Sequence, residues 1–284
     1  MLKAYYTLTK PGIIYGNVLT ACGGFLLASK GQVDAGLLVA TMAGISLVIA
    51  SACVINNLTD TNIDKKMART KQRALASGAI PRRSAVVYAV ILGLLGFSAL
   101  AVYTNVLTVA LGVLAIVDYV VLYAVAKRRS VHGTIVGSIA GALPATAGYT
   151  AVAGMFDLGA LLIFLIMTFW QMPHFFAIAM FRLKDYRAAG IPVLPAVEGL
   201  KAAKLQIVAY VGAFLAAVVL LAAAGYAGWW YLVVMVGFGA VWLVKGLQGF
   251  TAPDDVRWAR KMFGFSLLVL LAFSFMLSVD SFLP

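Results

Sequence analysis

The chain has 284 residues, of which 63% are hydrophobic and 11% are charged, and its mean hydropathy is +0.98. Soluble globular domains carry roughly 25% charged residues, so this composition excludes that class and indicates an integral membrane protein surrounded by the lipid bilayer. A net charge of +12 is compatible with a nucleic-acid partner, but the distribution of the basic residues along the chain argues against one.

Apolar residues come in nine blocks. Each block is about 18 to 23 residues long, which at about 1.5 Å per residue lets a helix cross a hydrocarbon core about 30 Å thick. In chain order the predicted membrane-spanning helices cover residues 12–29, 35–56, 84–103, 106–126, 133–153, 159–180, 206–224, 229–247 and 263–282. The first block is too long for the apolar part of a signal peptide, and Lys30-Gly31-Gln32 after it lacks a small-residue cleavage site. Cys22 and Cys53 lie inside predicted spans without metal-site spacing, so we expect small core residues there.

The basic residues fix a predicted orientation. With the amino terminus in the cytoplasm, 21 of the 22 Lys and Arg residues fall in cytoplasmic segments and only Lys30 falls outside. Because cytoplasmic loops carry an excess of basic residues, the sequence predicts an N-in, C-out topology. Two cytoplasmic loops, at about 58–83 and 181–205, are long and of mixed charge, and loops longer than roughly 15 residues in a compact fold are usually functional or disordered. We expect function, within a single transmembrane domain covering residues 1–284.

The two long loops follow the second and sixth predicted spans, so the pattern of spans and loops repeats with a four-span period. This repetition predicts a weak internal duplication, with a site where the two halves face each other.

A polar run at the end of the second span carries the strongest chemical signal. With Asn56 at zero and about 100° per residue, Asn57, Asp60 and Asp64 fall at about 100°, 40° and 80°, so one helix face holds two carboxylates and two amides. Hard oxygen ligands on one face suit Mg²⁺ that is also held by substrate phosphates. The alternative is that the two acids cap a helix end or pair with lysines in a solvated loop.

Basic residues follow the polar run directly. They are Lys65, Lys66, Arg69, Lys71 and Arg73. Such cations can neutralise the oxygens of a diphosphate and stabilise it as a leaving group. The sequence therefore predicts a site in which acids hold a metal ion and bases hold a phosphate.

Two further segments could contribute to this site. The second long loop has one clear acid, Asp185, among three cations, and could add one metal or phosphate contact. At the cytoplasmic end of the fourth span, Tyr123 and Lys127 stand one turn apart and Arg128 follows. The alternative is that the tyrosine belongs to an interfacial aromatic belt and the cations only anchor the helix.

Two ionisable residues lie deep in predicted spans. His174 follows Trp170-Gln171-Met172-Pro173, and intramembrane ionisable residues are functional candidates. If this helix continued to Asp185, His174 would lie on the same face about 16 Å deeper, where a metal-porphyrin could sit below a diphosphate. The alternative is an interhelical hydrogen bond beside the proline. Asp118 either has a partner that the sequence does not reveal or is protonated, and we assign it no catalytic role. We expect His132 at the surface.

These residues resemble the UbiA-type superfamily of membrane prenyltransferases over nearly the whole chain. The motifs that carry the resemblance are Thr9-Lys10-Pro11-Gly12, Asn56-Asn57 with Asp60 and Asp64, Met67-Ala68-Arg69-Thr70, Tyr123 with Lys127-Arg128, Gly141-Ala142-Leu143-Pro144, Trp170-Gln171-Met172-Pro173-His174, Asp185-Tyr186, Gly190-Ile191-Pro192-Val193-Leu194-Pro195 and Trp258-Ala259-Arg260-Lys261. Asn57 stands where the superfamily usually has its first Asp, which is typical of the branch that modifies heme. The second acidic motif is reduced to Asp185, so the number of Mg²⁺ ions stays open.

The resemblance implies an all-α helical bundle of the UbiA type with a central cavity open to the cytoplasmic side. It implies transfer of a farnesyl group from farnesyl diphosphate to the 2-vinyl group of protoheme IX (heme b), giving heme O and diphosphate. On this view Mg²⁺ is held by Asn57, Asp60 and Asp64, and the leaving diphosphate is stabilised by Arg69 and Lys127. The diphosphate side also includes Tyr123, Lys71, Arg73, Arg128 and Asp185, and His174 contacts heme. The expected location is a bacterial inner membrane, with a terminal oxidase or a heme A synthase as candidate partner.

Two other classes of function also stay open. A secondary transporter would have internal repeats and intramembrane ionisable residues, but its polar residues would lie near the midplane and open to both sides. A heme-binding assembly factor without catalysis would leave the polar run from Asn56 to Asp64 unexplained.

Overall fold

The computed structural model describes residues 1–283, and its regular elements are all helical. The α-helices are α1 (Leu2–Leu8), α2 (Pro11–Ser29), α3 (Ala35–Asp64), α4 (Arg82–Tyr103), α5 (Val106–Val117), α6 (Tyr123–Arg129), α7 (Gly133–Ala153), α8 (Leu158–Phe181), α9 (Leu183–Ala189), α10 (Leu194–Val197), α11 (Gly199–Ala223), α12 (Trp229–Leu247) and α13 (Asp255–Val279). A π-helical turn, η1 (Asp118–Leu122), joins α5 to α6, and two 3₁₀ turns, η2 (Gln248–Thr251) and η3 (Asp280–Phe282), follow α12 and α13.

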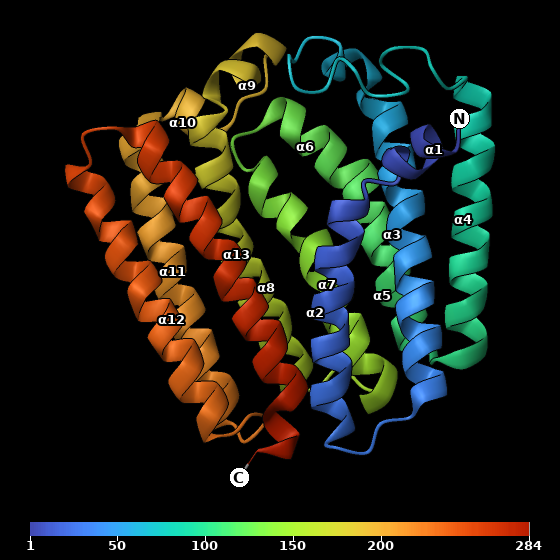
Figure 1. Cartoon of the computed structure of the whole chain (residues 1–284), viewed down its shortest axis with the longest axis vertical. Helices are drawn as coiled ribbons and strands as arrows, with labels where there is room; N and C mark the ends of the chain where they lie inside the picture. Colours follow the sequence, from blue (N-terminus) through green and yellow to red (C-terminus); the bar gives the residue numbers. More distant parts are fainter. Residues whose placement is uncertain (284) are drawn as a thin grey trace.

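Within the described residues, nine helices are long and apolar enough to cross a membrane, which confirms the predicted number of spans. The span Val106–Arg129 runs through α5, η1 and α6 without a break. Figure 1 shows the amino terminus at one end of the bundle, together with α9 and the segment after α3, while α13 runs to the opposite end. The two long loops of the sequence therefore lie at the same end. The orientation of the bundle in a membrane stays a prediction.

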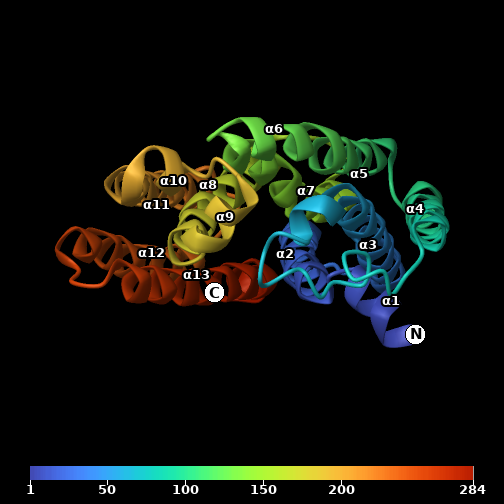
Figure 2. The same ribbon diagram turned by 90° about the horizontal axis from the view of Figure 1, so that it is seen from above.

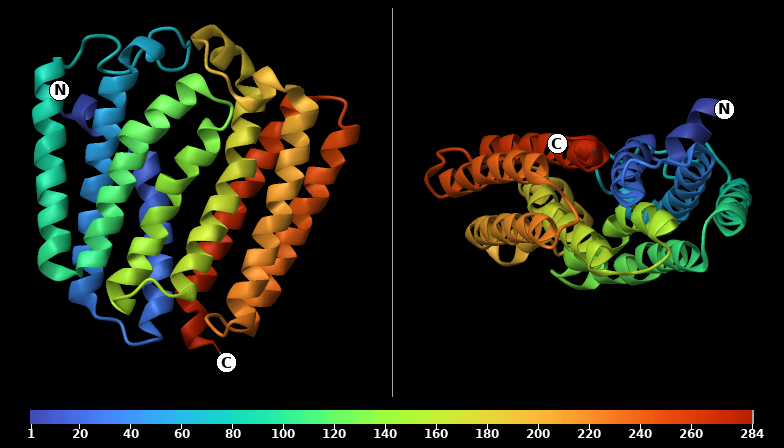
Figure 3. Two further views of the ribbon diagram at one scale, coloured as in Figure 1. Left: turned by 180° about the vertical axis from the view of Figure 1, so that it is seen from behind. Right: turned by 90° about the horizontal axis from the view of Figure 1, so that it is seen from below.

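Four helices form the centre of the bundle. α2 packs against α7 and α13, and α8 packs against the same two helices. Seen from above (Figure 2) and from below (Figure 3, right), α4 and α12 lie at the two far sides of the molecule. α2 and α7 approach closely because Gly24 and Gly148 lack side chains: a Cβ on either glycine would collide with the main-chain oxygen of the facing helix. Small residues permit such close contacts in membrane helix pairs.

Several helices extend beyond their predicted limits. α3 continues to Asp64 instead of ending at residue 56, and α11 and α13 begin at Gly199 and Asp255, so the loop predicted at 181–205 is partly helical. The 30 residues of α3 span about 45 Å, more than a hydrocarbon core of about 30 Å, so its last turns project beyond the core. The limits were predicted from hydropathy, which falls where the chain leaves the lipid. A helix can continue past that point while it packs against other parts of the protein.

Asp118 begins the π turn in the fourth span. Its side chain is buried, and Oδ2 accepts a hydrogen bond from the main-chain N of Ala140 at 3.1 Å. The partner that the sequence did not reveal is thus a backbone group of α7. Cys53 is buried and free, as predicted, whereas Cys22 is only half-buried. His132 is exposed, as predicted.

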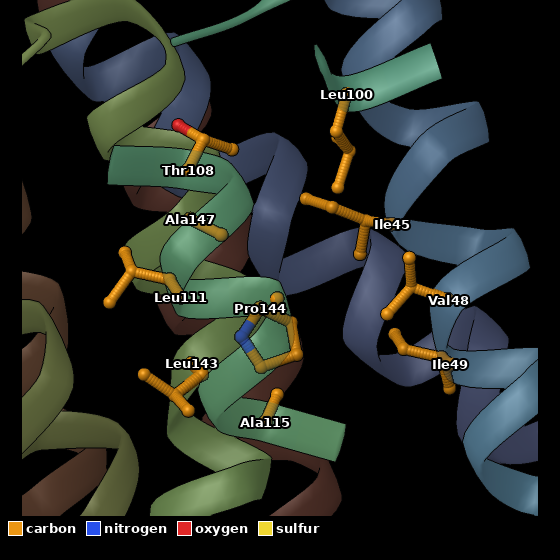
Figure 4. Close-up of a pocket in the computed structure, with 11 residues that line it drawn as sticks. Ile45, Val48, Ile49, Leu100, Thr108, Leu111, Ala115, Leu143, Pro144 and Ala147 are labelled. Atoms are coloured by element: carbon orange, nitrogen blue, oxygen red, sulfur yellow. The ribbon is translucent and has the colours of Figure 1, made fainter. Parts of the chain in front are cut away.

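Two cavities lie away from the polar residues of the second span. One is an apolar cavity of about 30 Å³ between α3, α4, α5 and α7, lined by residues such as Val48, Leu111 and Pro144 (Figure 4). The other is an apolar hollow of about 440 Å³ between α12 and α13, where Leu271 and Phe275 are exposed. Neither is the central cavity implied by the resemblance, which stays a prediction.

Candidate active site

The last turns of α3 turn their polar face into the protein. Asn56, Asn57, Asp60 and Asp64 are all buried, at 3%, 2%, 7% and 4% exposure. This arrangement confirms that the four side chains share one face, and it excludes the alternative of a solvated loop. Buried charges are unfavourable unless they are paired. The carboxylates on this face of α3 therefore need cations close to them.

Asp60 is paired with the end of the fourth span. Its Oδ2 accepts a hydrogen bond from Lys127 Nζ, and its Oδ1 lies 3.2 Å from Arg128 Nη2. The Lys127 side chain is only 10% exposed. A helix anchor would extend into water or lipid headgroups, so Lys127 does not behave as a simple topology anchor.

Asp64 is paired within its own neighbourhood. Arg73 Nη1 donates to both carboxylate oxygens at 3.0 Å and lies 3.4 Å from Asn57 Oδ1. The Asn57 amide nitrogen donates to Leu8 O at 2.7 Å, which turns the amide oxygen towards Arg73. Asn57 and Asp64 therefore share Arg73, whereas Asp60 is paired with Lys127 and Arg128.

The segment between α3 and α4 is folded onto the protein. Leu75 and Ile80 are buried against Leu8, Val54 and Leu58. The hydroxyl of Thr70 donates to the main-chain oxygen of Asp64 at 3.0 Å. This packing fixes the backbone on both sides of Arg73, so its guanidinium is held beside Asp64.

Sequence reasoning did not include Lys10 among the site residues. Its Nζ donates to Asn56 Oδ1 at 2.5 Å and lies 6.0 Å from the centre of the Tyr119 ring. Lys10 has a left-handed backbone (φ 55°), which is unusual for a residue with a side chain. Burial lowers the pKa of Lys10 to about 8. The motif Thr9-Lys10-Pro11-Gly12 was the available signal in the sequence, but only the packing of α1 against α3 brings Lys10 to Asn56.

Aromatic rings adjoin the charged groups. Tyr123 stacks on Tyr119 with ring centres 5.7 Å apart, and Lys127 Nζ lies 5.1 Å from the centre of the Tyr123 ring. Tyr186 on α9 lies near Arg69: burial raises the pKa of Tyr186, and the charge of Arg69 opposes that change. The charge of Arg69 therefore acts on Tyr186, and α9 lies beside the segment after α3 (Figures 1 and 3).

We call Lys10, Asn56, Asn57, Asp60, Asp64, Arg73, Lys127 and Arg128 the polar cluster. Three of the residues predicted to contact the diphosphate lie outside its direct contacts. Within residues 1–283, Arg69 and Lys71 are exposed and form no ion pair, and Asp185 pairs only with Arg182, at 3.9 Å. The structure thus brings Asn57, Asp60, Asp64, Arg73, Lys127 and Arg128 together, with Tyr123 beside them. The roles predicted for all of these residues stay predictions.

His174 lies in α8, apart from the polar cluster. The helix ends at Phe181 and α9 begins at Leu183, so the continuous helix to Asp185 considered above does not exist, and the depth inferred from it does not hold. The His174 ring is 9% exposed, stacks on Trp170 at 4.9 Å and hydrogen-bonds through Nδ1 to Ser266 Oγ at 2.7 Å. The interhelical hydrogen bond that was one of the two interpretations of His174 is therefore present. Contact with heme, the other interpretation, stays a prediction.

The oxygen atoms of the polar cluster fit Mg²⁺ in kind. Asn57 Oδ1 and the carboxylates of Asp60 and Asp64 are hard donors on one buried face. No group of three or more His, Cys, Asp or Glu side chains that could by themselves hold a metal ion occurs in the part of the chain that the structure describes. The protein alone therefore offers an incomplete set of ligands, which suits an ion that keeps waters and binds through substrate phosphates.

The chain is similar to known proteins over its whole length. It is 50% identical over 285 aligned residues to protoheme IX farnesyltransferase from Salmonella arizonae, covering 100% of this chain and 96% of that protein. It is 52% identical over 281 residues to protoheme IX farnesyltransferase 2 from Pseudomonas entomophila, covering 99% and 95%.

Solved structures share the fold. A UbiA homolog from Aeropyrum pernix K1 superposes with a TM-score of 0.76 at 20% identity, covering 95% of this chain and 98% of that one. A UbiA homolog from Archaeoglobus fulgidus, bound to GPP and Mg²⁺, gives 0.71 at 15% identity, covering 97% and 99%. The model of the UbiA prenyltransferase family matches residues 17–272. The chain therefore belongs to the UbiA prenyltransferase family.

Proposed function

We propose that this protein transfers a farnesyl group from farnesyl diphosphate to the 2-vinyl group of protoheme IX (heme b), giving heme O and diphosphate. Relatives that are about half identical over the full chain carry the name protoheme IX farnesyltransferase. The single observation that carries the proposal is the polar cluster, where buried carboxylates lie beside cations that can hold a diphosphate.

The acids of the cluster provide the metal site in this proposal. Asn57, Asp60 and Asp64 would hold Mg²⁺, and a UbiA homolog bound to GPP and Mg²⁺ supports this choice of ion. When bound, Mg²⁺ neutralises charge on the diphosphate and makes it a better leaving group. We leave the number of ions open because Asp185 does not contact the cluster acids.

The cations of the cluster pair with the cluster carboxylates in the absence of substrate and with the diphosphate when it binds. In the structure Arg73 neutralises Asp64, and Lys127 and Arg128 neutralise Asp60, so the buried charges are compensated. A diphosphate carries more negative charge than one carboxylate, so it attracts these cations and frees carboxylate oxygens. In the transition state the same cations stabilise the charge that develops on the departing oxygen. Arg69 and Lys71, which are exposed nearby, are proposed to attract the diphosphate to the site.

Both substrates are largely apolar. A fifteen-carbon chain, at about 0.8 kcal/mol per buried CH₂, favours burial by on the order of 10 kcal/mol, so its tail belongs among the helices. Loss of diphosphate leaves an allylic cation, and Tyr119 and Tyr123 offer aromatic faces beside the cluster that can stabilise it. The electron-rich vinyl group then attacks, and water is added to the product. His174 is proposed to contact heme.

The family and the charge distribution support a proposed location. The protein is a multi-pass membrane protein. We place it in a bacterial inner membrane with the polar cluster on the cytoplasmic side, because the loops that carry most of its basic residues lie at that end. A terminal oxidase or a heme A synthase is the proposed recipient of the product.

The test uses purified protein in lipid nanodiscs with heme b, farnesyl diphosphate and Mg²⁺, and mass spectrometry detects heme O. We expect product that disappears when EDTA removes Mg²⁺ and returns when the ion is restored. Consumption of a different prenyl acceptor, with heme b unchanged, would overturn the assignment of the substrate but not of the family.

A further inference from the structure

Ser266 on α13 makes hydrogen bonds that decide the protonation of His174. The Ser266 hydroxyl oxygen lies 2.6 Å from the main-chain oxygen of Phe263 and 2.7 Å from His174 Nδ1. A serine hydroxyl has one hydrogen, and a carbonyl oxygen can only accept. The hydrogen must therefore lie between Ser266 and Phe263, because two oxygens this close without it would repel each other. The Ser266 oxygen then accepts from His174, so Nδ1 of His174 carries a proton.

The second ring nitrogen of His174 is consequently the one with a free lone pair. A buried imidazole with no carboxylate partner among the described residues is neutral, so Nε2 has no hydrogen. Within residues 1–283 Nε2 has no hydrogen-bond partner, and it is not among the unpaired atoms that the protein fully encloses. Nε2 therefore keeps an unpaired lone pair and is not fully enclosed by the described residues.

The orientation of the ring is also fixed. Trp170, one turn before His174, stacks on it and donates from Nε1 to the main-chain oxygen of Ser266 at 2.8 Å. The Phe263 ring lies 4.8 Å from the imidazole. Ser266 thus hydrogen-bonds both His174 and Trp170 of α8, using its side chain for His174 and its backbone for Trp170.

We propose that Ser266 is a positioning residue, which holds His174 with its Nε2 lone pair available to the iron of the porphyrin substrate. This inference rests on the proposed function and refines it. A propionate would need a hydrogen-bond donor, and Nε2 in this tautomer is not one, so the geometry selects iron over propionate as the partner of His174. Histidines that bind metals usually donate their other N–H to an oxygen, which orients the ring and raises its basicity.

The test compares heme with protoporphyrin IX, which has the same ring and propionates but no iron. Binding of both to Ser266→Ala, Ser266→Thr and His174→Ala is titrated by absorbance in nanodiscs. The matched control is Ser274→Ala on the same helix, because Ser274 is also fully buried and its hydroxyl has no partner within the described part of the chain.

We expect Ser266→Ala to raise the heme Kd by about 10- to 100-fold and to alter the Soret band, as removal of such an outer partner usually does. Ser266→Thr should retain most of the heme affinity, and protoporphyrin IX should bind all variants equally. The KM for farnesyl diphosphate should not change. If Ser266→Ala weakens heme and protoporphyrin IX equally, or behaves like Ser274→Ala, the inference is wrong.

Turnover of wild-type protein, measured in parallel, separates this inference from the proposed function. Heme O formation by wild type together with unaltered heme binding by Ser266→Ala contradicts only the role of Ser266. Absence of heme O, with the iron-specific loss of binding retained, contradicts only the proposed reaction.

Discussion

The two ends of the bundle use polar side chains in opposite ways. At the end with the amino terminus, the acids of α3 are buried and their oxygens face cations from other elements. At the other end, Asp34, Asn105 and Asp157 each accept a hydrogen bond at 2.9 Å from a main-chain N–H at the start of α3, α5 and α8. The first end holds buried charges in mutual balance, whereas the second satisfies helix termini. Under the proposed function, the first end carries out the chemistry and the second end stabilises the helices.

The largest expected effect comes from replacing an acid of the polar cluster. Asp64→Asn keeps the shape of the side chain but removes the charge that Arg73 neutralises and a hard oxygen donor. We expect turnover to fall by about 10²- to 10³-fold, comparable to the loss of one preorganised electrostatic group in other enzymes. Heme O formation measured by mass spectrometry gives the rate. Asp34→Asn, at the other end, should turn over like wild type. Full Mg²⁺-dependent turnover by Asp64→Asn would refute the metal assignment.

A smaller loss is expected within one run of basic residues. Lys127→Met removes one of the two cations paired with Asp60, and kcat/KM for farnesyl diphosphate should fall by on the order of 10- to 100-fold. Arg129 is two residues further on, is exposed and has no ion-pair partner among the described residues, so Arg129→Met is the matched control and should stay within about twofold of wild type. Equal losses in both variants would mean that the cations act only as topology anchors.

The opposite end should respond in stability and not in catalysis. Asp157 begins α8 and also accepts hydrogen bonds from Tyr149 at 3.0 Å and Tyr226 at 3.3 Å. Asp157→Ala removes this cap, and the free energy of unfolding should fall by about 1 to 2 kcal/mol. Thermal unfolding in detergent reports the loss, while turnover at a temperature well below unfolding should match wild type. A large fall in turnover without a fall in stability would remove the functional contrast between the ends.

The pH dependence of stability gives the smallest predicted effect. The pKa of Lys10 falls from 10.5 to about 8 in the folded protein because the side chain is buried. Between these pH values the unfolded chain binds a proton that the folded chain lacks, so stability rises with pH in this window. The thermal midpoints of wild type and Lys10→Met are measured from pH 7 to pH 10. Above about pH 8 the midpoint of wild type should rise relative to that of Lys10→Met. Parallel curves would show that Lys10 does not titrate there.

Much of the architecture was predictable from local properties. Runs of apolar residues predicted all nine spans, because the bilayer imposes length and composition on each helix independently. The shared face of Asn56, Asn57, Asp60 and Asp64 was predictable because helical periodicity alone determines it. The ends of α3, α11 and α13 were wrong by up to eight residues, because hydropathy reports on the lipid and not on packing partners at the surface.

The site was predictable only in part. Asp60 and Lys127 come from separate spans, so their chemical types were predictable from the sequence but their pairing was not. Lys10 was missed because its position at the site depends on the fold of α1 and on a left-handed backbone, which no sequence pattern predicts. Arg69, Lys71 and Asp185 were included because of their charge, yet they do not contact the cluster acids. The charge of a residue does not determine which way its side chain points in the folded protein.

The sequence by itself determined that this protein is a nine-span membrane protein with a polar run at the end of its second helix, because hydrophobic length and helical period are local properties. Only the tertiary structure decided which cations neutralise those acids, which groups occupy the helix termini at the opposite end, and which nitrogen of His174 carries the proton. Those features depend on contacts between α1, α3, α6, α8 and α13, and such contacts are set by packing between segments far apart in the chain.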